Sequence, residues 1–285
     1  MDPLTQGLLG AATAQMCFGH KLPRSAWLIG MTAAMTPDLD VLVTRFTDDP
    51  LATWRYHRQF THALVFIPGG WFIAAIVLHW LFGRRLKLTF LQSFLFCTLG
   101  YATHGFLDAA TSYGTLLLWP FSEKRVSWDI ISVIDPVFTV PILCLVIAAA
   151  IRGSGAYARA ALLWGAFYLA LAALQQQSAL KMGREIADAR GHTNARVEVK
   201  PSFANILVWK TVYEAQGRFF VDAVRPGLSP RVYEGQSIRK LDIARDLPWL
   251  DLKSQQRRDI ERFRWFSQGY VSRDPDWPER VIDVR

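Results

Sequence analysis

Histidines and aspartates recur at close spacing in three short segments of the first 110 residues. The segments are PDLD at 37–40, HRQFTH at 57–62 and HGFLD at 104–108. His104 and Asp108 are four residues apart, a spacing that places both side chains on one face of a helix. Imidazole nitrogens and carboxylate oxygens are typical ligands of hydrolytic divalent-metal sites. The sequence therefore predicts a metal centre where the three segments meet.

The predicted metal ligands are His57, His62, His104, Asp108 and Asp38. This donor set favours zinc, and manganese or iron would also fit it. A catalytic metal activates water for hydrolysis. We expect Asp40 and Asp135 to serve as further ligands or as the general base. Arg58 and Arg55 are suited to a phosphate oxygen, because guanidinium groups donate to it in pairs.

Each of these residues also has a purely structural interpretation. Asp38 could cap a turn after Pro37, and His62 could begin a helix at a membrane interface. His104 and Asp108 could form a hydrogen-bonded pair that joins two helices. Ionisable groups in an apolar helix cost about 3 kcal/mol on insertion scales and usually mark function, which favours the metal-site interpretation.

Four apolar segments predict membrane-spanning helices, because each approaches the roughly 20 residues that cross the hydrocarbon core. They are residues 63–83, 88–107, 136–151 and 160–174. Two shorter segments, 4–18 and 25–35, predict packed or re-entrant helices. We therefore expect an all-α polytopic membrane domain of about four spans plus two short N-terminal helices, followed by a small soluble α+β domain.

The chain changes character near residue 180. Residues 181–285 hold 20 of the 32 Lys and Arg and 15 of the 24 Asp and Glu. Alternating segments at 205–214 and 218–225 predict a β-hairpin; residues 254–266 predict a basic amphipathic helix, and 281–285 a final strand. The expected domains are a helical membrane domain at 1–180, which contains the metal site, and a soluble domain at 181–285.

Charged residues of the first domain separate between its predicted loops. Seven basic residues and no acid lie at one end: Lys21, Arg24, Arg84, Arg85, Lys87, Arg152 and Arg159. All nine acids lie at the other end, together with five basic residues. By the positive-inside rule the acid-free end is cytoplasmic. The metal site and the C-terminal domain are therefore expected in the periplasm or exterior.

Several other classes of protein are disfavoured. The three cysteines, Cys17, Cys97 and Cys144, lie in separate apolar segments, so we expect buried thiols rather than a disulfide framework. The basic residues form no dense stripe, which argues against a nucleic-acid partner. The N-terminal MDPLTQGLLG lacks a positive region and a cleavage site, so we expect no removable signal peptide.

The sequence resembles the YdjM-like family, described as inner-membrane metal-dependent hydrolases. The matching elements are MDPLT with GLLGAA, PDLD, HRQFTH, HGFLDAATSYG and DIISVIDP, which together cover the membrane domain. Many relatives look as if they begin with Thr-His where this chain has Thr5-Gln6. If that histidine is a ligand in those relatives, Gln6 leaves one coordination position without its ligand or passes it to Asp2 or water. The family is distantly similar to zinc-dependent phospholipases C and single-strand nucleases, which implies phosphoester hydrolysis.

Together these features predict a divalent-metal-dependent hydrolase in the bacterial inner membrane, with several spans. Its expected substrate is a phosphoester in a lipid or lipid-linked molecule, and the bilayer is its expected partner. Two alternatives stay open. One is a proton- or ion-coupled transport protein in which the same His and Asp residues titrate. The other is a non-catalytic, metal-stabilised scaffold that presents the C-terminal domain.

Overall fold

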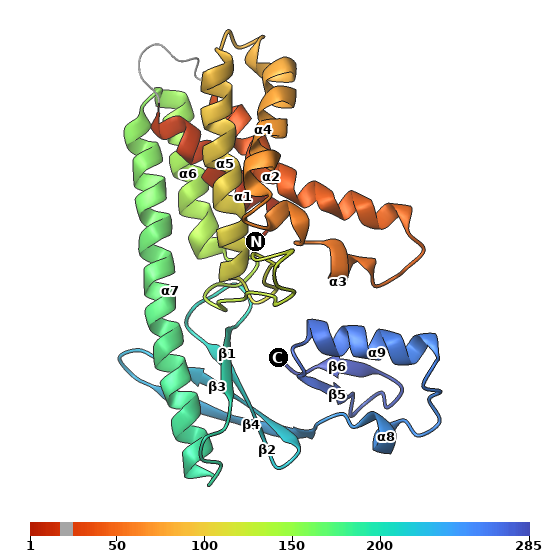
Figure 1. Cartoon of the computed structure of the whole chain (residues 1–285). Coiled ribbons are helices and arrows are strands. Elements are labelled where there is room, and N and C mark those ends of the chain that lie inside the picture. Colours follow the sequence, from red (N-terminus) through yellow and green to blue (C-terminus); the bar gives the residue numbers. More distant parts are fainter. Residues whose placement is uncertain (18–24) are drawn as a thin grey trace. The chain divides into compact units, whose positions relative to one another are not determined.

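A computed structural model describes residues 1–17 and 25–285, which form two compact units. The first unit comprises Met1–Ala172 with Phe203–Asn205, and the second comprises Ala173–Ser202 with Ile206–Arg285. Figure 1 shows that the first unit is helical and that the second contains the strands. The boundary falls within one long helix, α7 (Gly155–Ala189).

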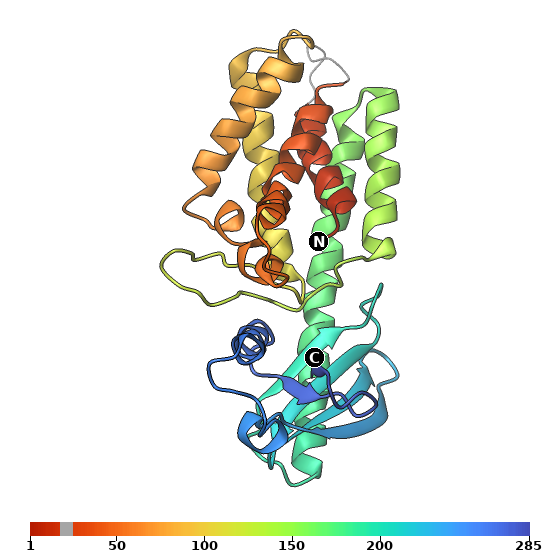
Figure 2. The same ribbon diagram turned by 90° about the vertical axis from the view of Figure 1, so that its right-hand side faces the viewer.

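The other helices of the first unit are mostly short. They are α1 (Pro3–Met16), α2 (Trp27–Met35), α3 (Ala52–Tyr56), α4 (Ile67–Leu78), α5 (Phe90–Ala110) and α6 (Pro136–Arg152). Three further helical segments, η1 (Thr36–Phe46), η2 (Phe60–His62) and η3 (His79–Gly83), extend or connect them. In both ribbon views α4 and α5 run side by side (Figures 1 and 2).

Local sequence signals explain where several of these helices begin. Asp2 caps α1 by accepting a hydrogen bond from Thr5 N at 3.0 Å, with proline at the first helical position. Thr89 and Gln92 form a capping box at the start of α5. Asp135 caps α6, which also begins with a proline. These three caps fix where α1, α5 and α6 begin, and α5 carries two of the predicted ligands.

Glycines allow α1, α2 and α5 to cross at very short distances. A Cβ atom on Gly10 of α1 would lie 2.3 Å from the carbonyl oxygen of Gly30 in α2. A Cβ atom on Gly100 of α5 would lie 2.5 Å from that same oxygen. Larger residues would therefore force the helices apart. This crossing brings the end of α2, and η1 after it, against the ligand-bearing part of α5.

The prediction of about four membrane spans is wrong. Within the described residues, α7 alone is a single helix long and apolar enough to cross a bilayer. Residues Ala52–His62 and Ile67–Gly83 meet that standard only as one broken segment, bent by 83°. The predicted span at 136–151 is α6, which has 17 residues. The predicted span at 88–107 becomes α5, which is 21 residues long but carries buried Ser93, His104 and Asp108.

The segment that follows α5, residues 111–130, is hydrogen-bonded to residues of and next to the HRQFTH segment at 57–62. Trp128 N and Ile130 N donate to carbonyl oxygens at the end of α5, at 2.6 and 2.8 Å. Leu116 N then donates to Arg58 O at 3.0 Å, and Leu64 N donates to Leu117 O at 2.9 Å. The loop thereby holds residues 58–64 beside the C-terminal turns of α5.

The second unit contains a four-stranded antiparallel sheet in the order β1-β2-β3-β4. Its strands are β1 (Val197–Pro201), β2 (Trp209–Ala215), β3 (Arg218–Arg225) and β4 (Arg231–Arg239). Strands β5 (Val271–Arg273) and β6 (Val281–Asp283) form a separate pair, and the short helices are α8 (Ile243–Asp246) and α9 (Gln255–Phe266). The predicted hairpin is confirmed as β2 and β3, with Val212 paired to Val221.

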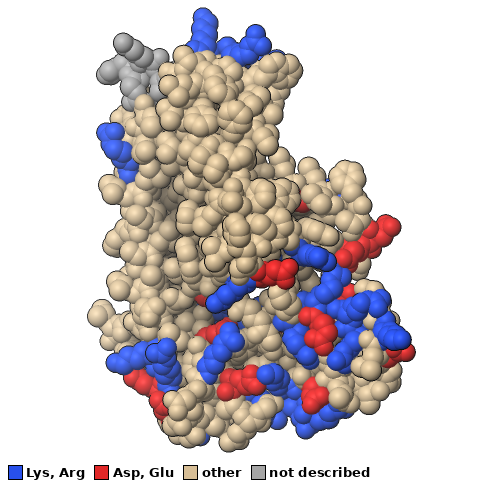
Figure 3. Space-filling view, viewed as in Figure 1, with Lys and Arg blue, Asp and Glu red and all other residues tan. Residues whose placement is uncertain are grey.

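Surface chemistry differs between the two units. In the face shown in Figure 3, charged side chains are sparse over the helical unit and dense over the C-terminal unit. All three cysteines are free, and the prediction that they are buried holds only for Cys97, because Cys17, directly after α1, and Cys144 of α6 are exposed. Lys21 and Arg24, which support the predicted orientation, lie outside the described residues.

Candidate metal centre

Two histidines and two aspartates from three segments converge in the first unit: Asp38 of η1, His62 of η2, and His104 and Asp108 of α5. One donor atom of each lies within 4.8 Å of the others. His62 Nε2 is 3.1 Å from Asp108 Oδ2, and His104 Nε2 is 3.3 Å from the same oxygen. Asp38 Oδ1 lies 3.6 and 3.4 Å from the two imidazole nitrogens.

These four atoms lack the hydrogen bonds that buried polar atoms normally make. Asp38 Oδ1, His62 Nε2, His104 Nε2 and Asp108 Oδ2 are all buried and have no hydrogen-bond partner among the described residues. Native proteins rarely leave such atoms unsatisfied, and each one costs stability. Four of them that face one point, two being carboxylate oxygens, fit a bound cation. The donor set of two imidazoles and two carboxylates suits a divalent transition metal such as zinc.

In both His62 and His104 the second ring nitrogen, Nδ1, makes a hydrogen bond, as it almost always does in metal-binding histidines. His104 Nδ1 lies 2.5 Å from Ala34 O, a pure acceptor, so Nδ1 carries the proton and Nε2 the lone pair. Thr61 Oγ1 donates to Asp40 Oδ2 at 2.8 Å and therefore accepts from His62 Nδ1, also at 2.8 Å. Such contacts select the ligand tautomer and orient the ring. Both histidines thus present Nε2 to the centre.

Three further groups contact the Asp108 carboxylate, two at its outer oxygen and one at the oxygen that faces the centre. Its Oδ1 accepts from Gln6 Nε2 at 3.0 Å and contacts the amino group of Met1. Arg58 Nε lies 3.2 Å from Oδ2. Gln6 therefore supports a carboxylate of the centre through its amide nitrogen, whereas its Oε1 atom has no partner among the described groups.

A second, smaller cluster adjoins the first. His57 Nδ1 lies 2.7 Å from Asp40 Oδ1, and Asp40 Oδ2 accepts from Arg58 N and Thr61 Oγ1, both at 2.8 Å. Donor atoms of His57, Asp40 and Asp38 also lie within 4.8 Å of one another. Hydrogen bonds already satisfy Asp40, which is 2% exposed, whereas the His57 side chain is 18% exposed. Asp40 is thus suited to orient the His57 ring rather than to bind a metal.

The charges of the centre shift the pKa values of its groups. Burial alone would raise the pKa of the Asp38 carboxyl, but the close approach of the His104 and His62 imidazoles outweighs burial and holds the pKa far below its usual range. Burial likewise opposes the charged form of His104, yet without a bound cation the adjacent Asp108 and Asp38 carboxylates raise its pKa to about 9. The two carboxylates thus generate a strongly negative potential at the imidazoles.

The remaining predicted residues lie elsewhere or are already engaged. Arg58 is 5% exposed and lies against Asp108 and the Tyr113 ring, with its backbone in the left-handed region at φ 62°. Arg55 is exposed and covers the Tyr56 ring. Asp135 belongs to neither cluster; it caps α6 and accepts from Tyr168 Oη at 2.9 Å. The structure therefore does not bring Asp135 to the centre.

Sequence reasoning missed the residues that support the ligands. Thr61 bonds both Asp40 and His62, and Tyr101 Oη donates to Thr61 O at 2.9 Å. Thr61 lies directly before a predicted ligand, which was the one available signal. The Ala34 carbonyl and the Met1 amino group are backbone groups, and residue type alone does not reveal such partners.

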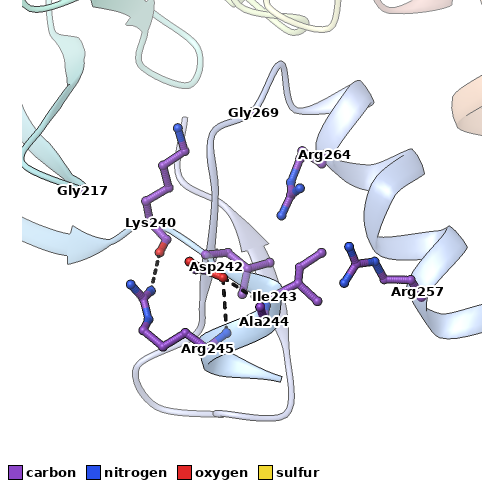
Figure 4. A pocket seen from close by; sticks show the side chains of 10 residues that line it. Gly217, Lys240, Asp242, Ile243, Ala244, Arg245, Arg257, Arg264 and Gly269 are labelled. Carbon is purple, nitrogen blue, oxygen red and sulfur yellow. Dashed lines mark hydrogen bonds between the residues drawn. The ribbon is translucent and has the colours of Figure 1, made fainter. Parts of the chain in front are cut away.

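The C-terminal unit contains a basic hollow of about 550 Å³ (Figure 4). Its cationic side chains are all paired with carboxylates: Lys240 with Glu214, Arg245 with Asp246, and Arg257 and Arg264 with Glu261. Because their charge is already compensated, we assign no anion site there.

The chain thus combines a buried two-histidine, two-aspartate centre with a helix of membrane-spanning length. The chain belongs to the YdjM inner membrane protein family, which matches residues 1–179. The match covers the whole candidate centre and ends before the sheet of the second unit. An inner-membrane location follows from this membership.

Two known proteins are similar to part of this chain. The inner membrane protein YbcI of Escherichia coli (strain K12) is 30% identical over 131 residues, which cover 43% of this chain and 73% of YbcI. The uncharacterized protein YfhP of Bacillus subtilis (strain 168) is 29% identical over 129 residues, which cover 45% of this chain and 38% of YfhP. No solved structure shows a significant match.

Proposed function

We propose that this protein is a membrane-bound, divalent-metal-dependent hydrolase that cleaves a phosphoester. The observation that supports this most strongly is the set of four buried donor atoms that face one point without hydrogen bonds. Asp38, His62, His104 and Asp108 would hold the cation, with zinc favoured by the mixed nitrogen and oxygen donors. When bound, the cation would supply Lewis acidity and make water a better nucleophile.

The residues around the ligands suggest how protons would move. His57 Nδ1 donates a hydrogen bond to Asp40 and keeps its proton, so Nε2 of that ring carries the lone pair and can act as a base. Because His57 is the more exposed member of the pair, it could take a proton from water and pass it to the leaving group. Asp40 is then a positioning residue, since Arg58 N and Thr61 Oγ1 occupy its second oxygen.

The proposed substrate is a lipid or lipid-linked phosphoester, which is consistent with membership of an inner membrane family. Arg58 is not free to bind phosphate, because its guanidinium faces Asp108 and donates to Thr111 Oγ1 at 3.3 Å. We further propose that the C-terminal unit, whose strands follow α7, is periplasmic. A reporter fused after Arg285 should then be active in the periplasm, and activity only in the cytoplasm would reverse this orientation.

Hydrolysis assays of the full-length protein in detergent test the proposal. The substrates would be a soluble bis-aryl phosphodiester, an aryl phosphate and a panel of phospholipids, before and after chelation and with Zn²⁺, Mn²⁺ or Fe²⁺ restored. We expect cleavage that chelation abolishes and one metal restores. Asp108→Asn should abolish it, whereas His79→Gln, which alters a histidine bonded to Ser93, should not.

The proton-transfer role has its own variant. His57→Gln should lower kcat while leaving the bound metal in place, because His57 is outside the four-residue centre. A protein that binds metal but cleaves no member of the panel would contradict the hydrolase proposal and favour a metal-stabilised scaffold.

A further inference from the structure

An apolar groove of about 380 Å³ runs along α4 beside the candidate metal centre. Its walls are formed by Leu39, Phe60, Phe66, Ile73, Val77 and Leu78, with Gly69 and Gly70 between them. Gly69 leaves one wall open, because a Cβ atom there would meet nothing within 4 Å. From Gly69 to Leu78 the helix rises by about 13 Å, so the groove is long as well as apolar.

Every segment that supplies a metal ligand also supplies a wall of this groove. Leu39 lies between Asp38 and Asp40, and Thr61 directly precedes His62. Tyr101 lies one helical turn before His104, and its hydroxyl is occupied by Thr61 O at 2.9 Å. One end of the groove is therefore lined by residues of the three ligand-bearing segments, and the rest follows apolar residues of α4.

A second apolar groove, of about 790 Å³, provides a contrast. It is lined by α1, α5, α6 and α7 together with Trp128 and Ile130. Neither η1 nor η2 contributes to it, so it adjoins α5 alone among the ligand-bearing segments. Although this second groove is larger, it is lined by only one of the three ligand-bearing segments. Lipid bound in it can therefore be compared with lipid bound in the groove along α4.

We propose that the α4 groove holds one hydrocarbon chain of a lipid substrate whose polar head lies at the metal centre. This inference rests on the proposed function and identifies the part of the substrate that selects it. A mainly apolar cleft lined by the same three segments that carry a cluster of charged ligands matches a molecule with an apolar tail and a polar head. Ile73 and Val77, which are 64% and 47% exposed, would be covered by that tail.

Photo-crosslinking locates the chain without requiring turnover. The full-length protein would be placed in nanodiscs of phosphatidylethanolamine and phosphatidylglycerol, with a trace of phosphatidylglycerol that carries a diazirine in one acyl chain. Peptide mass spectrometry would then map the labelled residues. We expect labels concentrated on the groove residues of α4 and on Leu39, above those at exposed α4 residues outside the groove.

Two matched variants on α4 provide the test. Ile73 lines the groove, whereas Ile76 does not and is similarly exposed, at 48%. Ile73→Trp should reduce labelling of Leu39 and Val77 by about fivefold or more by filling the cleft, and Ile76→Trp should leave it unchanged. Equal labelling in both variants, or labels spread evenly around α4, would overturn the proposal.

Hydrolysis assays separate this inference from the proposed function. If the protein is a lipid hydrolase, Ile73→Trp should lower kcat/KM for long-chain phospholipids and spare the soluble aryl phosphate. Selective labelling of the groove in a protein that cleaves no substrate would support the acyl-chain site and contradict the hydrolase proposal. Cleavage of the soluble substrate without selective labelling would support the hydrolase proposal and contradict the acyl-chain site.

Discussion

His62 Nε2 and Asp108 Oδ2 lie 3.1 Å apart, are both buried, and make no hydrogen bond with each other or with any other described residue. His104 Nε2 approaches the same oxygen at 3.3 Å in the same way. A His-Asp pair that only joined helices would form a directed hydrogen bond, because that is what stabilises such a pair. The geometry therefore favours a shared cation over a structural lock.

Thr61 is expected to tune metal affinity without binding the metal. Thr61→Val removes the hydroxyl that bonds both Asp40 and His62 Nδ1, so the ring loses its fixed orientation. Supporting groups of this kind are worth about 10- to 100-fold in affinity, and we expect a loss of that size by metal titration. Thr98→Val, which removes a hydroxyl bonded within α5, should leave the affinity unchanged. Equal effects of the two variants would refute this role.

Arg58 is expected to stabilise the metal-free protein. Its guanidinium lies 3.2 Å from the buried Asp108 carboxylate, and removing one partner of a buried pair costs about 3 kcal/mol or more. Arg58→Ala should therefore clearly lower the thermal unfolding temperature of the protein from which metal has been removed with a chelator. Arg55→Ala, at an exposed position, should change stability by about 0.5 kcal/mol or less. An unchanged melting temperature for Arg58→Ala would show that the pair contributes nothing.

Asp135 is expected to act as a helix cap. Asp135→Ala removes the side chain that accepts from Val137 N, Phe138 N and Tyr168 Oη, and lost caps cost about 1 kcal/mol. The variant should thus be less stable but should retain its full metal content and hydrolytic rate. A folded variant that binds less metal or has a lower kcat would contradict this and would indicate that Asp135 takes part in the metal site.

In the C-terminal unit, Asp222 is expected to be the most sensitive carboxylate. It is 3% exposed and accepts two hydrogen bonds from Arg190, at 2.6 and 2.9 Å, as well as one from Gly235 N. Asp222→Ala should destabilise this unit by about 3 kcal/mol, measured by thermal unfolding and limited proteolysis of the full chain. Glu185→Ala removes an exposed pair with Lys181 and should cost about 0.5 kcal/mol at most.

The sequence predicted the components of the centre better than the architecture around it. His104 and Asp108 come together because the i,i+4 spacing fixes both on one face of α5, whereas Asp38 and His62 are brought to them by the α2–α5 crossing and by the loop after α5. Asp135 could not be excluded in the same way, since a carboxylate before a proline can be a cap or a ligand. The partners of Nδ1 depend on tertiary packing, which spacing does not encode.

The number of membrane spans was overestimated because hydropathy measures composition and not continuity. Residues 63–83 read as one uncharged span, yet α4 begins only at Ile67 and meets the preceding helical residues at a sharp bend. In the second unit, β4 was missed because most of its residues are exposed and give no apolar alternation. Its neighbour β3, with Phe219, Asp222 and Val224 buried, was predicted with its exact bounds.

The most direct test of the central claim is the metal content of the full-length protein. Elemental analysis by mass spectrometry after purification in detergent and dialysis against trace Zn²⁺ should find about one divalent ion per chain, the number that a four-ligand site holds. Asp108→Asn and His62→Gln should lose it, and His79→Gln should keep it. Wild-type protein that holds no divalent ion, or ligand variants that hold as much as wild type, would contradict the account.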